Sequence, residues 1–294
     1  MNKFLVLSVV LLTSFKTYAL IDYSEVVPVN EEKKSTNNSF QKISNKSSSE
    51  NGNRGLAWKS DLSFTSHYES MDIKGEKYGV LKFDTHVQTP ANIFFNASYW
   101  HAQTGKTNSS GNPKLVLGFN WLKFGSPSDE AKLDLYAGVK LKSNSLLGSS
   151  RTDKVFGIET TKRFGTFGLG IGYDLTMVGR AGSIDEMAIG NINRLVVSGG
   201  WMVSQDIQFE LELENFKVTN SSDTGVVNRL KENVSFSTFS PKLNLGLAPA
   251  INLEMGARYR IKKAQESANL INGRVFDLNG ANANSLFAGL NLTI

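Results

Sequence analysis

Apolar and polar residues alternate along most of the chain from Trp58 to Ile294, in segments about as long as a β-strand. In 132–142, Leu133, Leu135 and Val139 are separated by polar, glycine or tyrosine positions. Successive side chains of a β-strand point to opposite faces, so such a segment has one apolar and one polar face. The segments 207–214 and 251–262 alternate in the same way and predict further strands of this kind.

Twelve such strands are predicted, at residues 58–68, 79–88, 92–101, 114–124, 132–142, 154–164, 166–178, 192–203, 206–218, 232–247, 250–262 and 284–294. Most have the roughly 9–11 residues that a tilted strand needs to cross a bilayer. Two are less regular. The segment 154–164 alternates weakly, and in 232–247 the parity changes between Phe236 and Leu243, which predicts a β-bulge near Pro241.

The predicted connections alternate between short and long. The short ones are Thr89–Ala91, Gly125–Ala131, Gly165, Ser204-Gln205 and Ala248-Pro249, and the longer polar ones are Glu69–Tyr78, Ala102–Pro113, Gly179–Asn191, Thr219–Lys231 and Lys263–Ala283. Short turns on one side and long loops on the other are typical of up-and-down barrels in bacterial outer membranes. An even number of strands returns both ends of the barrel to the short-turn side.

Aromatic residues concentrate near the predicted strand ends. Near the short turns lie Trp58, Phe94, Trp121, Phe124, Phe164, Phe167, Trp201 and Phe209, and near the long loops lie Tyr68, Tyr99 and Tyr259. Of these we expect Trp58, Trp121, Trp201, Phe209 and Tyr259 at membrane interfaces, where aromatic girdles form. A soluble β-sandwich would alternate similarly, with its apolar face as the core. Strand length, loop asymmetry and aromatic placement favour the membrane barrel.

Three regions follow from the N-terminus onward. Residues 1–19 resemble a secretory signal peptide, with a basic start at Lys3, a short apolar core and small residues up to Ala19. Residues 20–56 are rich in Ser, Asn, Lys and Glu, which predicts a disordered polar periplasmic segment. Such a segment would serve as a tether, or as a plug threaded through the lumen. Residues 57–294 form the predicted all-β barrel.

Composition narrows the range of functions. The chain has no cysteine, which excludes disulfides and thiolate metal sites. Its formal net charge is only +5 over 294 residues, which gives no reason to expect nucleic acid as a partner. Only 40% of the residues are hydrophobic, as expected when a strand needs apolar residues at alternate positions alone.

Charged residues on the predicted polar face are the main candidate functional site. Glu210, Glu212 and Glu214 form an acidic column, and a basic column in the segment 250–262 follows Glu254. The complete set of predicted lumen charges is Lys140, Lys142, Arg194, Glu210, Glu212, Glu214, Glu254, Arg258, Arg260 and Lys262. These charges would either select solutes at a constriction or pair with one another in a closed lumen.

Catalytic and metal chemistry find little support in the sequence. The three histidines, His67, His86 and His101, fall at different heights and on different faces of the predicted barrel, so no metal site is expected. Tyr99-Trp100-His101-Ala102 lacks the Ser-Asn-Gly partner that a barrel lipase would need at a suitable spacing. We therefore expect a protein without enzyme activity and without a cofactor.

The segment 58–294 resembles small porin-like outer-membrane barrels of about twelve strands in Gram-negative bacteria. The resemblance lies in the strand pattern, in Leu62–Tyr68 of the first strand and in the alternation of Leu286, Leu290 and Ile294 in the last. It departs from the pattern at Ile294, where such barrels usually end on an aromatic residue.

The resemblance implies a location in the outer membrane, contact with lipid, and assembly by the barrel-assembly machinery. It also implies a passive pore for small polar solutes. The alternatives are a closed structural or adhesive barrel acting through its surface loops and, further off, a barrel enzyme or a translocator.

Overall fold

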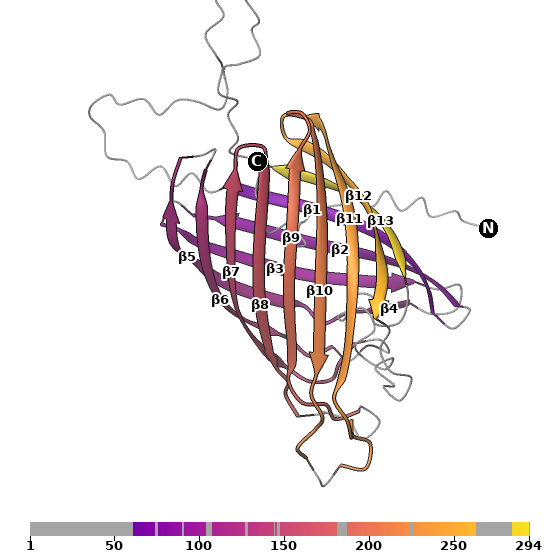
Figure 1. The fold of residues 1–294 in the computed structure, drawn as a ribbon. Helices are drawn as coiled ribbons and strands as arrows, with labels where there is room; N and C mark the ends of the chain where they lie inside the picture. The colour runs from indigo at the N-terminus through magenta and orange to yellow at the C-terminus, as the bar shows by residue number, and fades with distance from the viewer. Residues whose placement is uncertain are drawn as a thin grey trace, which may run out of the picture.

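The computed structural model describes residues 61–293, apart from 74–75, 90, 104–107, 127–128, 144, 146–147, 181–186, 224–225 and 263–283. The chain forms one antiparallel β-barrel (Figure 1). The predicted signal peptide, the polar segment 20–56 and Trp58 lie outside the described residues. Among the residues that are described, no helix is long and apolar enough to cross a bilayer.

Twelve long strands and one short one make up the described barrel. The long strands are β1 (Asp61–Ile73), β2 (Glu76–Gln88), β3 (Ile93–Gln103), β5 (Lys114–Phe124), β6 (Ala131–Lys140), β7 (Asp153–Phe164), β8 (Phe167–Met177), β9 (Ile192–Met202), β10 (Ile207–Val218), β11 (Val234–Ala248), β12 (Ile251–Lys262) and β13 (Ser285–Thr293). The short strand β4 (Asn108–Ser110) pairs only with β3. The predicted twelve-stranded all-β barrel is thereby confirmed.

Pairing between the first and last strands closes the sheet. β1 runs antiparallel to β13 from Ser63, opposite Thr293, to Met71, opposite Ser285. Every other long strand pairs with its two neighbours along the chain. Closure leaves no free edge, and the backbone hydrogen bonds between strands are satisfied internally, as a bilayer requires.

Short turns and long connections lie at opposite ends of the barrel, as predicted (Figure 1). At the tight turn between β7 and β8, Gly165 has a φ of 63°, a left-handed conformation that glycine adopts without strain. One predicted loop is wrong. Most of Glu69–Tyr78 is strand, because β1 continues to Ile73 and its ladder with β2 continues to the pair Ile73 and Glu76.

β10 shows how the alternation positions the side chains. Leu211 and Leu213 are exposed on the outer face, whereas the three glutamates that alternate with them, Glu210, Glu212 and Glu214, are buried on the inner face. The outer face of the neighbouring strands is also apolar, with Leu169, Ile171 and Val197 exposed. An apolar outer face and a polar inner face are the reverse of a soluble barrel, and they fit a protein surrounded by lipid.

Inward aromatic rings cover glycines on adjacent strands. Tyr136 on β6 lies opposite Gly157 on β7, and a Cβ atom added to Gly157 would collide with the tyrosine ring. Phe287 covers Gly256 of the neighbouring strand in the same way. These glycines provide room for large rings against the inner wall, as aromatic residues commonly do over glycine in curved sheets.

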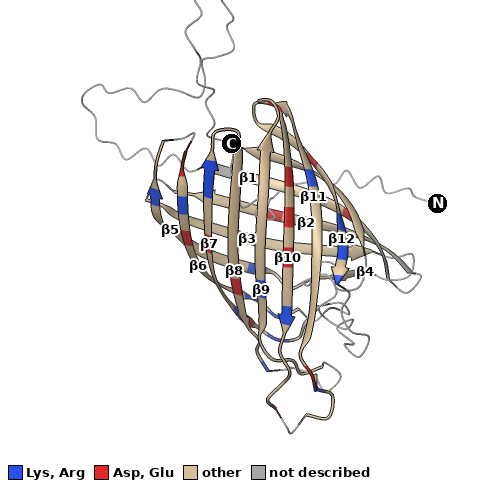
Figure 2. Cartoon of the chain, viewed as in Figure 1, with Lys and Arg blue, Asp and Glu red and all other residues tan. Residues whose placement is uncertain are grey.

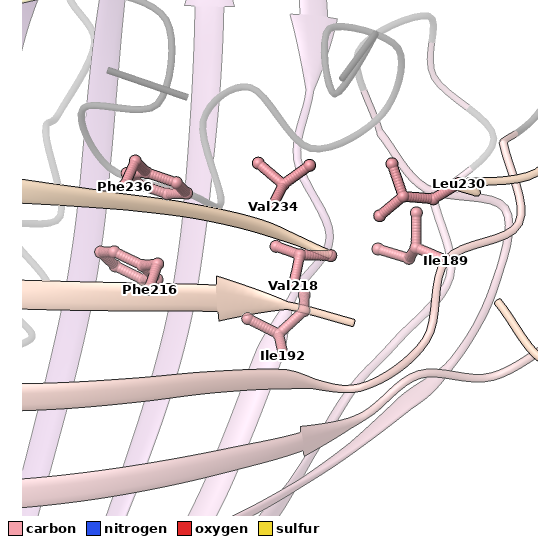
Figure 3. Packing of buried hydrophobic residues seen from close by; sticks show 7 residues of the cluster. All are labelled: Ile189, Ile192, Phe216, Val218, Leu230, Val234 and Phe236. Carbon is pink, nitrogen blue, oxygen red and sulfur yellow. The ribbon is translucent and has the colours of Figure 1, made fainter. Parts of the chain in front are cut away.

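The inner face becomes apolar at the long-loop ends of β9, β10 and β11. A cluster of buried residues lies there, consisting of Ile189, Ile192, Phe216, Val218, Leu230, Val234 and Phe236 (Figure 3). The rings of Phe216 and Phe236 stack with their centroids 4.7 Å apart. Two long connections join this cluster, because the Leu230 amide donates to the Ala188 carbonyl over 2.8 Å.

Because the inner face is apolar at this end of the barrel, apolar residues change from one face to the other along the predicted strand 232–247. β11 pairs with β10 without a register shift, so Phe236 points inward and Phe239 outward on one regular strand. The bulge predicted near Pro241 is therefore wrong. The register shifts lie between β11 and β12, at Ser237/Thr238 and Gly246/Ala248. At this end of the barrel, the apolar side chains of β9, β10 and β11 are buried against one another on the inner face.

Candidate functional site in the charged lumen

Ionisable side chains of both signs line the inner face of the barrel. They come from β1, β2, β5, β6, β7, β8, β9, β10, β11 and β12, and on β10 three acidic residues occupy successive inward positions (Figure 2). All three, Glu210, Glu212 and Glu214, are buried. The inner face of the strands therefore forms one electrostatic system, and its pairing decides what the lumen can do.

Arg194 on β9 connects the acids of its two neighbouring strands. Its Nη1 lies 2.7 Å from Asp174 Oδ2 on β8, and its Nη2 lies 2.5 Å from Glu214 Oε1 on β10. Asp174 also accepts a hydrogen bond from the hydroxyl of Tyr136 on β6. The guanidinium group offers several donors in a fixed plane, which suits a position between two carboxylates.

The same set of ion pairs continues around the wall through Arg258 on β12. Arg258 Nη1 lies 2.7 Å from Glu69 Oε1 on β1, and Arg258 Nε lies 4.0 Å from Glu214 Oε2. Glu69 also accepts from Lys82 on β2 and from Ser285 on β13. We call the alternating chain Asp174, Arg194, Glu214, Arg258, Glu69 and Lys82 the ion-pair belt.

Lys242 on β11 holds the other two glutamates of β10. Its Nζ lies 2.9 Å from Glu212 Oε2 and 3.4 Å from Glu210 Oε1. All three side chains are almost completely buried, with only 1% of the lysine side chain exposed. Burial of a lysine ammonium is costly without paired charges, so these contacts are needed for the lysine to occupy this position.

The rim at the short turns contains a further ion-pair group. Glu130, between β5 and β6, lies 2.9 Å from Lys132 Nζ and 3.1 Å from Lys123 Nζ. Burial raises the pKa of the Glu130 carboxyl, but hydrogen bonds and charge from the two lysines lower it by more, so the net pKa lies below the ordinary value.

Most of the charges predicted for the lumen lie on the inner face, and two do not. Lys140, Glu254 and Arg260 alternate in phase with inward residues of β6 and β12. Lys142 lies beyond the end of β6 and is exposed. Lys262 is on the outer wall, where its Nζ donates to Ser235 Oγ over 2.7 Å.

The position of Lys262 follows from a register shift. Ser237 pairs with Lys262 and Thr238 pairs with Arg260, so Ile261 has no partner on β11. One extra residue reverses the facing of every position beyond it. The sequence therefore predicts the wrong side of the wall for this lysine.

Four of the five residues predicted at membrane interfaces lie on the outer face, and the fifth, Trp58, is outside the described residues. Trp121 and Trp201, near the short turns, are 55% and 56% exposed. Phe209 and Tyr259 are also exposed on the outside. Phe94, which the sequence places with the short-turn aromatics, points inward and is buried over Gly118. Contact with lipid headgroups stays a prediction for the outward residues.

Several lumen residues are missing from the sequence-based prediction. Glu69 lies just beyond the predicted end of the first strand at Tyr68, whereas Lys82 lies within the predicted strand 79–88. Lys242 lies next to Pro241, in the stretch where the predicted alternation changes face. Asp174 was detectable as the polar member of a regular alternation on β8. A count of inward positions within the predicted strands identifies Lys82 and Asp174, whereas Glu69 requires the longer first strand that pairs with β2.

The described residues include no cluster of three His, Asp or Glu side chains arranged to hold a metal ion. His86 Nδ1 instead lies 2.5 Å from Asn96 Oδ1 of the adjacent strand. The arrangement is therefore one of ion pairs and hydrogen bonds along a barrel wall, and it can act on a solute by charge, size and hydrogen bonding.

Comparison with known proteins supports the fold. No protein-family model matches the sequence, and no curated protein matches it. Among solved structures, an outer membrane channel from Pseudomonas putida F1 is similar with a TM-score of 0.55 and 11% identity, covering 80% of this chain and 95% of that one. The NanC porin is similar with a TM-score of 0.53 and 10% identity, covering 78% of this chain and 100% of that one.

Outer membrane phospholipase A from Escherichia coli is also similar, with 12% identity and a TM-score of 0.40, and it covers 83% of this chain and 94% of that one. A likeness this distant gives no ground for a shared activity. The chain thus has the fold of a bacterial outer-membrane β-barrel, and its apolar outer face is the surface for lipid contact.

Proposed function

We propose that this protein is a passive channel for small hydrophilic solutes in the outer membrane of a Gram-negative bacterium. The observation that carries the proposal is the ordered inner face. A barrel with an apolar outside holds alternating charges around its wall, from Asp174 through Arg194 and Glu214 to Arg258 and Glu69. Such a wall attracts polar solutes, and the proposal includes no catalytic step.

The number of strands supports a narrow passage. Eight-stranded barrels are filled by their own side chains, whereas barrels of about 16–18 strands enclose an aqueous channel. A barrel with twelve long strands lies between these limits. The belt residues contact one another along the wall, either between adjacent strands or across one intervening strand. The two similar structures are themselves a channel and a porin by name, which agrees with the proposal.

The proposal extends to biogenesis. The outer face of β13 carries Leu286 and Leu290, which are exposed, and the strand pairs with both β12 and β1. We propose that this terminal strand is the segment that the barrel-assembly machinery recognises. The prediction is that replacing Leu290 with Asp reduces the amount of folded protein in the outer membrane more than it reduces synthesis.

Single-channel recording tests the channel directly. The purified full-length protein, folded in detergent, would be inserted into a planar bilayer in symmetric KCl. We expect discrete current steps of uniform size that scale with salt concentration. Folded barrels that insert and carry no current would overturn the proposal, provided that insertion is verified by protease protection or labelling of the bilayer-inserted protein.

A closed barrel that acts through its surface loops is the second candidate, and two observations favour it. The side chains of Lys242, Glu210 and Glu212 are almost completely buried, as in a filled lumen. Apolar residues also fill the inner face near Phe216 at the long-loop end. This candidate predicts absence of conductance together with high stability, so the same recording separates the two functions.

A further inference from the structure

Six carboxylates occupy the half of the lumen nearest the short turns. They come from β2, β6, β7, β10 and β12, and therefore surround much of the wall. We call them the acidic ring, and they are Asp84, Asp134, Glu159, Glu210, Glu212 and Glu254. The ion-pair belt lies farther toward the long loops on the same strands, as the positions of Glu214 on β10 and Arg258 on β12 show.

The ring and the belt differ in how their charges are paired. Glu159 on β7 is only 8% exposed, and within the described part of the chain it makes no hydrogen bond or ion pair. Asp84 on β2 is equally buried and likewise has no such contact with a described residue. Each acid of the belt, in contrast, contacts at least one cation directly.

Neighbouring acids add further negative charge around Glu159. Asp134 on β6 lies directly opposite Glu159 on β7, and it accepts a hydrogen bond from the neutral amide of Asn120 over 2.7 Å. Like charges directly opposite each other across two strands repel. Among the other charges that act most strongly on Glu159 are two further acids, Glu210 and Glu212, and one cation, the belt residue Arg194.

Two of the cations near the ring, Lys242 and Lys82, already contact other carboxylates. Lys242 contacts both glutamates of β10, so one positive charge serves two negative ones. On the opposite wall, Asp84 is influenced by Lys82, Lys114 and another acid, Glu254. Lys82 is itself paired with Glu69 of the belt. Cations such as Lys114 and Arg163 also lie on the inner face, but within the described part of the chain no direct ion pair joins a cation to Asp84 or Glu159.

A strip without bulky side chains lies between Glu159 and the glutamates of β10. Toward the short turns, the inward positions of β8 are Gly168, Gly170 and Gly172. Ser198 on β9 follows in register between Gly170 and Glu212, and it is 2% exposed. Its Oγ has no hydrogen-bond partner within the described part of the chain. A buried hydroxyl without a partner is costly, and here it adjoins an acidic side chain.

These observations point to an external source of positive charge. A buried carboxylate that lacks a protein partner either takes up a proton or is neutralised by a cation from solution. We propose that the acidic ring is a cation-selective section of the lumen, which admits small hydrated cations and solutes bearing an ammonium group. The inference rests on the proposed channel function. Rings of Asp and Glu side chains are a recurring device for selecting cations in pores.

The test measures selectivity in a salt gradient. The full-length wild-type protein and the variants Glu159→Gln, Asp84→Asn and the double variant would be recorded in planar bilayers with KCl at two concentrations. We expect the wild type to prefer K⁺ over Cl⁻, and each single change to lower the K⁺/Cl⁻ permeability ratio by about twofold or more. The matched control is Asp206→Asn, which removes an exposed carboxylate in the turn between β9 and β10.

Each outcome has a separate meaning. Absence of any current would overturn the proposed channel itself. A conducting wild type that prefers anions, or variants whose permeability ratio equals that of the control, would overturn the cation-selective ring and leave the channel standing. The unfolding midpoint of Glu159→Gln is expected to match the wild type, because no ion pair is lost. A large loss of stability would reveal a protein partner for this carboxylate and would also overturn the inference.

Discussion

Replacing Lys242 with methionine tests whether the lumen charges hold the barrel together. Methionine has a similar length and keeps the apolar stem, so the main change is loss of the ammonium group. In the folded protein this group lies 2.9 Å from Glu212 Oε2 and 3.4 Å from Glu210 Oε1. The variant therefore leaves two buried carboxylates side by side on the inner face of β10 without their shared cation.

The expected cost follows from these distances and from burial. At an effective dielectric constant of about 20, unit charges at the two distances attract by about 6 and about 5 kcal/mol. Loss of the lysine also removes the cost of burying its own charge, which offsets much of this attraction. Breaking a buried ion pair by removing one partner costs about 3–5 kcal/mol net. We expect Lys242→Met to lower the free energy of unfolding by an amount in this range.

Equilibrium unfolding in urea, followed by tryptophan fluorescence in detergent micelles or lipid vesicles, measures the change. The matched control is Lys162→Met, at an outer ion pair in which Lys162 Nζ lies 2.6 Å from Asp129 Oδ1. That pair is largely exposed, and exposed pairs contribute about 0–1 kcal/mol. The comparison separates the effect of burial from the effect of distance, because the exposed Lys162–Asp129 pair is closer than either contact of Lys242.

A second variant checks the cause of the destabilisation. Adding Glu210→Gln and Glu212→Gln to Lys242→Met removes the two orphaned charges, and we expect it to recover most of the lost stability. If Lys242→Met unfolds like the Lys162→Met control, within about 1 kcal/mol of the wild type, the buried pairing has no energetic importance. The closed-lumen interpretation of these charges would then be refuted.

Three further predictions concern sidedness, packing and topology. Leu211→Arg, on the outer face in the middle of β10, should lower the free energy of unfolding in lipid vesicles by about 2–4 kcal/mol. Thr176→Arg, on the inner face of β8, should lower it by less, and equal losses would contradict the assigned faces. Gly157→Ala should destabilise by about 1–3 kcal/mol because its Cβ would displace the Tyr136 ring, whereas Gly199→Ala, where the nearest atom would be 3.7 Å away, should be close to neutral in the same assay. The chain has no cysteine, so single cysteines can be labelled selectively. Val227→Cys, in a long connection at a residue that is 98% exposed, should react with a membrane-impermeant maleimide on intact cells, whereas Gln205→Cys in a short turn should not. The opposite labelling would show that the topology is inverted.

The sequence alone determined where the strands are and which way most side chains point. Leu211 and Glu212 occupy opposite faces because consecutive residues of an extended chain must do so, whatever their neighbours. The short turn at Gly165 is equally local, since a residue in the left-handed region is required there. These features depend on few residues at a time, so the pattern in the chain suffices to predict them.

Only the tertiary structure decided which charges meet. Arg258 and Glu69 are paired although 189 residues separate them, because closure between β1 and β13 brings their strands near each other. A single unpaired residue, Ile261, turns Lys262 to the outer wall. The inward apolar cluster around Phe216 likewise depends on where the surrounding lipid ends. Strand register, sheet closure and the position of the bilayer are properties of the assembled barrel, so no local pattern specifies them.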